Sequence, residues 1–240
     1  MAPGSIQPLD KAPPLREQIY ERLEELIIYG VLRPGEHLVE SHLAQRLGVS
    51  RLPVREALQL LHRDGWVDLR PRQGAFVHEA TVREADEMFQ MRTLLEVESA
   101  RLAARNATDQ AVEKLREVLA TGVQALEWTG DRELVRLNSV FHAHVTAMAG
   151  NRVLADTIAR LDKWIRWYLS PVLRQRSASS WQEHAELVDA IAKRDLDLAG
   201  EVMRRHTELT RGVYLEGREP DGQLPQEQAA QEQSPQRSSP

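Results

Sequence analysis

The segment between positions 47 and 63 separates apolar from cationic residues at helical spacing. A helix from Ser50 to about Arg63 is predicted, because its apolar side chains fall at i, i+3, i+4 and i+7: Val54, Ala57, Leu58 and Leu61. Arg51, Arg55 and Gln59 recur every fourth residue on another face. That face is either simply solvated or contacts DNA, since arginine can grip guanine or phosphate and glutamine can pair with adenine.

The residues before this helix favour the DNA interpretation. Gly48 can take the left-handed conformation that ends a supporting helix over Glu40–Leu47. Ser50 can then cap the following helix. A further helix is predicted from Leu15 to about Tyr29, so the pattern is typical of a helix-turn-helix.

The residues after this helix predict a β-hairpin wing. Two short strands, at residues 66–70 and 75–78, flank a turn that carries Arg72 and Gly74 at its tip. Residues 15–78 are therefore predicted to form a winged helix-turn-helix domain that binds DNA. The chain has a net charge of −5, but six arginines and three acids between Arg46 and Arg72 make this segment locally basic.

The rest of the chain predicts helices only. Six are expected, at residues 81–106, 108–128, 131–150, 151–169, 179–194 and 195–216. The fold class is thus mainly α, with an N-terminal winged helix-turn-helix and a C-terminal antiparallel all-α bundle over residues 79–216. Residues 1–14 and 217–240 lack apolar periodicity and are expected to be a flexible arm and a disordered tail. The sequence has no cysteine and no apolar run of membrane-spanning length, so we expect a cytoplasmic protein with no membrane partner.

Polar residues interrupt the apolar faces of three bundle helices. Asn138 and His142 lie one turn apart on one of them, and His184 lies on another. The final helix is expected to bury Val202, His206, Leu209 and Val213. The histidines are either hydrogen-bonded core residues or ligands that converge on a metal ion inside the bundle.

Arg92 lies among apolar residues of the first bundle helix. It either points inward to receive an anion or pairs with Glu96 one turn further along the chain.

The stretches LVESHLAQRLGVSRLPVREALQLLHRDGWV, MRTLLEVESARLAA, NSVFHAHVTAMAGN and EHAELVDAIAKRDLDLAGEVMRRH resemble the GntR family of transcriptional regulators. The resemblance is to the FadR-type subfamily, which has a C-terminal FCD ligand-binding domain. It implies a homodimer that binds a palindromic double-stranded DNA operator. It places Ser50, Arg51 and Arg55 at DNA-contacting positions and Gly74 at the wing tip. Ser41 stands where several relatives have arginine, so one DNA contact is expected to be missing.

The same resemblance implies a sensing site in the bundle. Asn138, His142, His184 and His206 match positions that hold a divalent metal of the zinc, nickel or manganese type, with Asn138 in place of the commoner aspartate. Arg92 is then expected to hold a small organic acid effector beside the metal. The expected function is a ligand-responsive regulator, acting as a repressor.

Two other functions compete with this prediction. One is a metal-dependent hydrolase that uses the same histidines, which would need a carboxylate at the site to move protons. Glu183 and Glu186 are expected to lie off the histidine-bearing face, which argues against it. The other is a DNA-binding protein without an effector.

Overall fold

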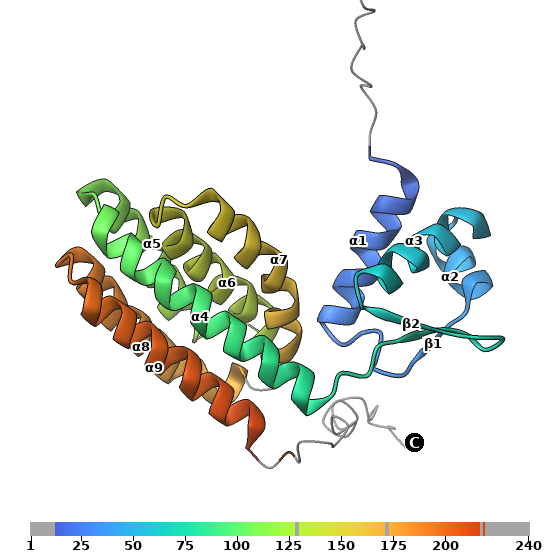
Figure 1. Cartoon of the computed structure of the whole chain (residues 1–240). Coiled ribbons are helices and arrows are strands. Elements are labelled where there is room, and N and C mark those ends of the chain that lie inside the picture. The colour runs from blue at the N-terminus through green and yellow to red at the C-terminus, as the bar shows by residue number, and fades with distance from the viewer. Residues whose placement is uncertain (1–12, 128–129, 171–172, 217, 219–240) are drawn as a thin grey trace, which may run out of the picture. The chain divides into compact units, whose positions relative to one another are not determined.

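The computed structural model describes residues 13–127, 130–170, 173–216 and 218. The chain divides into two compact units, with the division between Glu79 and Ala80 (Figure 1). The arm predicted over residues 1–14 and the tail over residues 217–240 lie almost wholly outside the described residues.

The first unit is a winged helix-turn-helix. Helices α1 (Leu15–Ile28), α2 (Glu40–Leu47) and α3 (Arg51–Arg63) precede the strands β2 (Val67–Arg70) and β3 (Gly74–Val77). Gly48 ends α2 with φ +66°, as the sequence predicted. The core is formed where α1 packs on α3, and it includes Leu23, Ile27, Val54, Leu58, Leu61 and Trp66.

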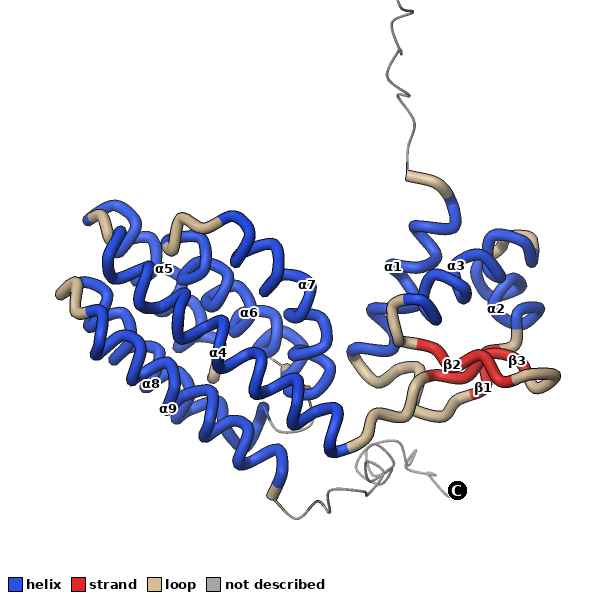
Figure 2. Tube along the Cα trace, in the orientation of Figure 1, coloured by secondary structure: helices blue, strands red, loops and turns tan. Residues whose placement is uncertain are grey.

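A third strand completes the wing and was missed by the sequence prediction. Strand β1 (His37–Leu38) pairs antiparallel with β3, so the sheet order is β1-β3-β2 (Figure 2). Two residues are too few to show an alternating pattern, and β1 forms only because β3 offers a free edge.

The second unit contains six helices within the described residues, so the predicted mainly α fold class is confirmed. They are α4 (Val82–Asn106), α5 (Asp109–Ala125), α6 (Asp131–Met148), α7 (Arg152–Leu169), α8 (Leu173–Ala192) and α9 (Leu196–Leu215). Helix α4 packs against α6, α7, α8 and α9, and it lies along α9 in Figure 1. A capping box between Thr81 and Glu84 fixes the start of α4.

Two expectations for this unit were wrong. Helix α8 begins at Leu173, whereas the sequence predicted a start at residue 179. The first turns were missed because buried polar residues such as Arg176 occupy inward positions, so no apolar period marks them. On α9, Leu209 is 46% exposed and Val213 is only half-buried, whereas Thr207, Thr210 and Tyr214 are buried. The inward face of α9 is therefore rotated from the predicted stripe. No helix among the described residues is long and apolar enough to cross a membrane.

Candidate functional site

The exposed face of α3 carries the residues predicted to contact DNA. Arg51, Arg55 and Gln59 are exposed, whereas Val54, Ala57, Leu58 and Leu61 are buried. Ser50 occupies the N-cap position, but its side chain makes no capping hydrogen bond and is exposed. The face is thus open to a partner, although Arg51 and Arg55 both bind Glu40 of α2, which the sequence did not predict.

The other predicted DNA contacts lie at the tip of the wing. Arg72 and Gly74 are exposed, and both have positive φ, +63° and +106° respectively. A Cβ on Gly74 would come within 2.8 Å of Nε2 of His37, so glycine here also makes room for β1. Phe76 links the three strands of the wing through its ring. The ring of His37 stacks on it at a centre-to-centre distance of 4.6 Å, and the guanidinium carbon of Arg70 lies 4.3 Å from its centre.

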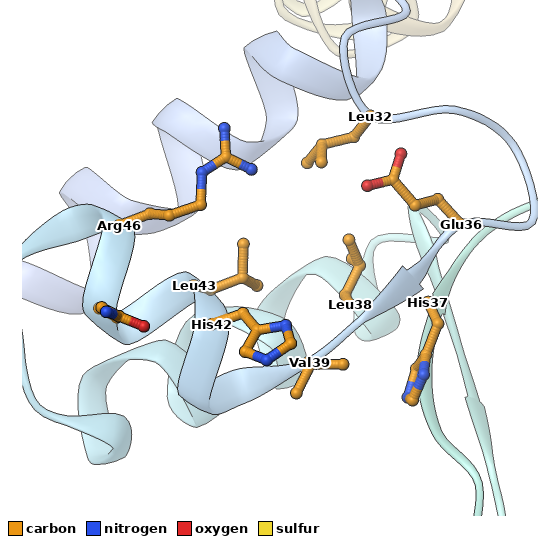
Figure 3. A pocket seen from close by; sticks show the side chains of 9 residues that line it. Leu32, Glu36, His37, Leu38, Val39, His42, Leu43 and Arg46 are labelled. Carbon is orange, nitrogen blue, oxygen red and sulfur yellow. The ribbon is translucent and has the colours of Figure 1, made fainter.

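A hollow of about 310 Å³ lies elsewhere in this unit, between α2 and the segment before it (Figure 3). Its lining includes Glu36, His42 and Arg46. None of the predicted DNA contacts lines it, so it is separate from the exposed face of α3.

Three histidines from different helices meet inside the helical unit. One ring nitrogen from each of His142 on α6, His184 on α8 and His206 on α9 lies within 4.8 Å of the others. All three side chains are buried, and their ring centres are 4.7 to 5.1 Å apart. Asn138, one turn before His142, is also buried. The structure therefore brings together the histidines that the sequence singled out.

Carboxylates lie close to two of the three imidazoles, and one of the two contacts is a hydrogen bond. Oε2 of Glu96 lies 2.8 Å from Nδ1 of His142, and Nδ1 of His206 donates to Glu183 at 2.7 Å. Glu183 also accepts hydrogen bonds from Nη1 and Nη2 of Arg176, at 3.0 and 2.7 Å. Glu183 was expected off the histidine-bearing face, and that expectation was wrong. Since each carboxylate faces Nδ1, it orients the ring in the way that metal-bound histidines are usually oriented from behind.

Arg92 points inward and also pairs with Glu96. It is 2% exposed, its Nε donates to Glu96 at 3.1 Å, and its Nη2 lies 3.2 Å from Nε2 of His142. Its Nη1 is buried and has no hydrogen-bond partner among the described residues. Arg92 therefore pairs with Glu96 and also points toward the histidines.

Burial is the main cause that keeps the imidazoles of His184 and His206 neutral at pH 7. Burial, together with the charges of His206 and His142, lowers the pKa of His184 well below its usual value. Burial also lowers the pKa of His206 to about 4, although the hydrogen bond to Glu183 opposes the shift. Burial would raise the pKa of Glu96, but Arg92 and His142 outweigh it and lower that pKa. Neutral imidazoles next to ionised carboxylates are suited to hold a cation.

A further observation, on the surroundings of His184, shows that the residues of the cluster are suited to hold a metal ion. His184 is 1% exposed, yet neither of its ring nitrogens has a hydrogen-bond partner among the described residues. Its ring is held between Phe141, stacked at 4.1 Å, and Trp181, edge-on at 4.8 Å. A buried imidazole without partners is costly, and a bound cation would give one of its nitrogens a partner.

The fold thus joins a winged helix-turn-helix to a helical unit that encloses a buried polar cluster, which is the architecture of a DNA-binding protein with a second, all-helical domain. The chain belongs to the GntR family of bacterial regulatory proteins. Residues 15–77 match that family, and residues 87–209 match the FCD domain. The family resemblance predicted from the sequence is therefore confirmed.

Similar proteins are transcriptional regulators. The chain is 28% identical over 202 residues to the HTH-type transcriptional repressor RspR of Escherichia coli, covering 83% of this chain and 89% of the relative. It is 30% identical over 216 residues to the repressor NanR of Cronobacter sakazakii, covering 80% and 82%. The solved structure of McbR/YncC of E. coli is 26% identical, with a TM-score of 0.69 over 85% of this chain and 98% of that one. The protein is therefore a transcriptional regulator, and the hydrolase alternative is set aside.

Proposed function

We propose that this regulator is a repressor whose helical unit binds a divalent metal ion and a small carboxylate effector, and that the effector changes operator affinity. The observation that carries the proposal is the buried meeting of His142, His184 and His206, in which neither nitrogen of His184 has a hydrogen-bond partner among the described residues. The names of RspR and NanR support the repressor part.

In this proposal the three histidines and Asn138 hold the metal, of the zinc, nickel or manganese type. All four are neutral ligands, so a bound divalent ion keeps its full charge and supplies a Lewis-acid centre that attracts a carboxylate. Glu96 and Glu183 fix the ring orientations of His142 and His206 from the Nδ1 side.

Arg92 provides the second contact to the effector. In the structure its Nη2 faces Nε2 of His142, and its Nη1 has no hydrogen-bond partner within the described part of the chain. If His142 held a metal ion through Nε2, that nitrogen would no longer be available to Arg92, whose N–H groups could then donate to a carboxylate.

Arg92 lies on α4, the helix that directly follows the end of the DNA-binding unit at Glu79. Effector binding can shift the operator-binding equilibrium only through its different affinity for the DNA-competent and DNA-incompetent states. A coupling of about 1–3 kcal/mol is typical, and α4 is the segment through which we propose it acts.

On the DNA side, we propose that a cytoplasmic homodimer presents two α3 helices to adjacent major grooves of a palindrome. Ser50, Arg51, Arg55 and Gln59 would contact bases and phosphates, and Arg72 and Gly74 at the wing tip would contact the minor groove.

The deciding experiment is operator binding in the presence of small carboxylic and sugar acids, before and after treatment with a chelator. We expect at least one acid to weaken operator binding about 5- to 150-fold, and the chelator to abolish this response. If no acid changes the affinity and metal analysis finds no bound ion, the sensing proposal is wrong. The protein would then be an effector-free DNA-binding regulator.

A further inference from the structure

Glu40 connects the two arginines of the recognition helix α3. It begins the neighbouring helix α2. Its Oε1 accepts from Nε of Arg55 at 2.8 Å, and its Oε2 accepts from Nη2 of Arg55 at 2.8 Å and from Nη2 of Arg51 at 3.2 Å. One carboxylate therefore binds three N–H groups that belong to two guanidinium groups.

This carboxylate stands on a surface that must attract phosphates. A negative charge there lowers the affinity for any DNA, whatever its sequence. The hydrogen bond from Arg55 is the main cause that lowers the pKa of Glu40, so the group is charged at neutral pH. The cost to general DNA affinity implies that Glu40 contributes something that a neutral residue would not.

The geometry shows what that contribution is. Arginine has five N–H donors in a planar fork, and Glu40 takes the side formed by Nε and one N–H of Nη2. The end formed by Nη1 and the second N–H of Nη2 has no hydrogen-bond partner among the residues that the structure describes. This end presents two parallel donors, the arrangement that can bind O6 and N7 of one guanine.

The exposure of the three side chains agrees with this arrangement. Arg51 and Arg55 are 63% and 54% exposed, whereas Glu40 is only 25% exposed. The carboxylate thus sits behind the guanidinium groups and leaves their outer edges accessible. Long side chains fixed before binding lose less conformational entropy when DNA arrives.

We propose that Glu40 is a positioning residue that orients Arg51 and Arg55 for sequence-specific DNA binding. The inference rests on the DNA-contact role proposed above for the two arginines. It predicts that Glu40 increases discrimination between operator and other DNA while lowering affinity for both through its charge.

The test compares Glu40→Gln, Glu40→Asp and the control Glu56→Gln, which removes the same charge from α3 itself. One duplex is the sequence that the wild-type chain enriches from a randomised pool, and the other is its scrambled form. The measured quantity is the dissociation constant for the scrambled duplex divided by that for the selected duplex, at several salt concentrations. A high ratio means strong discrimination. Thermal melts confirm that each variant is folded.

We expect Glu40→Gln to lower the ratio about tenfold, with tighter binding to the scrambled duplex because a negative charge is removed. Glu40→Asp keeps the charge but is one methylene shorter, so we expect it to lower the ratio too. Glu56→Gln should leave the ratio unchanged. An account based on charge alone predicts instead that Glu40→Asp behaves like the wild type.

The inference is overturned if both Glu40 variants keep or raise the ratio. It is also overturned if Glu40→Gln causes the same loss in an Arg55→Ala background, because a residue that acts through Arg55 must show coupling to it. If Arg55→Ala bound the operator as tightly as the wild-type chain, the DNA-contact role of Arg55 would be wrong, and the inference with it.

Discussion

His184 shows how a single residue can define a buried site. Its ring stacks on Phe141 and meets the edge of Trp181, so it cannot turn away to find other partners. Its two ring nitrogens nevertheless have no hydrogen-bond partner among the described residues. Packing therefore holds an imidazole with a free lone pair beside His142 and His206.

This leads to a prediction about metal binding. Adding Zn²⁺ at about a hundred times its dissociation constant should stabilise the wild-type chain by about 2.7 kcal/mol, because the ion binds only the folded site. His184→Ala should lose most of this gain, measured by thermal unfolding with and without EDTA. His144→Ala is the matched control, since His144 lies on α6 outside the cluster and its Nδ1 contacts the carbonyl of Val140. An equal zinc effect in both variants would contradict the site.

Arg55 carries the corresponding prediction on the DNA side. Arg55→Ala should weaken specific operator binding by about 1–3 kcal/mol, because a base or phosphate contact is lost. Arg63→Ala is the control, since Arg63 is 69% exposed at the end of α3 and pairs with Asp64. Fluorescence anisotropy with a labelled operator measures both. A loss of the same size for Arg63→Ala would show only a general charge effect.

At the scale of elements, α5 and α8 approach closely at Gly122. A Cβ at this position would lie 1.9 Å from the ring of Trp181, which is buried. Only glycine lets the indole pack against the backbone of α5, and the same indole supports the ring of His184. The approach of two helices thus also positions a site residue.

We therefore expect Gly122→Ala to destabilise the protein by about 1–3 kcal/mol, because a rigid aromatic ring in a packed core must shift. Gly212→Ala on α9 is the matched control, since among the described residues a Cβ added there meets no heavy atom within 4 Å beyond the adjoining turns of its own helix. Alanine there should stabilise the protein by about 0.5–1 kcal/mol through helix propensity. Urea unfolding measures both variants. An unchanged free energy of unfolding for Gly122→Ala would show that α8 can move away from α5 without cost.

At the scale of the whole molecule, one chain carries two units. The DNA-binding unit presents a cationic face on α3, and the helical unit encloses the polar cluster around Arg92. A dimer follows from the proposed palindromic operator, because two recognition helices must then be held at a fixed spacing.

This spacing can be tested directly. Inserting about five base pairs between the half-sites rotates one of them by half a helical turn, so both α3 helices can no longer bind from the same side. We expect operator affinity to fall to that of a single half-site, and inserting about ten base pairs to restore part of it. Light scattering should give twice the 27.3 kDa mass of one chain. A monomer that tolerates the half-turn insertion would contradict the dimer.

The sequence by itself determined the element types and the exposed face of α3. Apolar periodicity is a local property, and it marked Val54, Leu58 and Leu61 as buried and Arg51 and Arg55 as exposed. It also singled out His142, His184 and His206 as polar interruptions of apolar faces, but it could not show that they meet.

Only the tertiary structure decided that meeting and the partners around it. Whether a polar residue can face inward depends on a partner from another helix, as with Glu183 and His206, and no period along one helix encodes this. The start of α8 and the inward face of α9 were mispredicted for the same reason. The contact of Glu40 with Arg51 and Arg55 likewise exists only because α2 and α3 pack together.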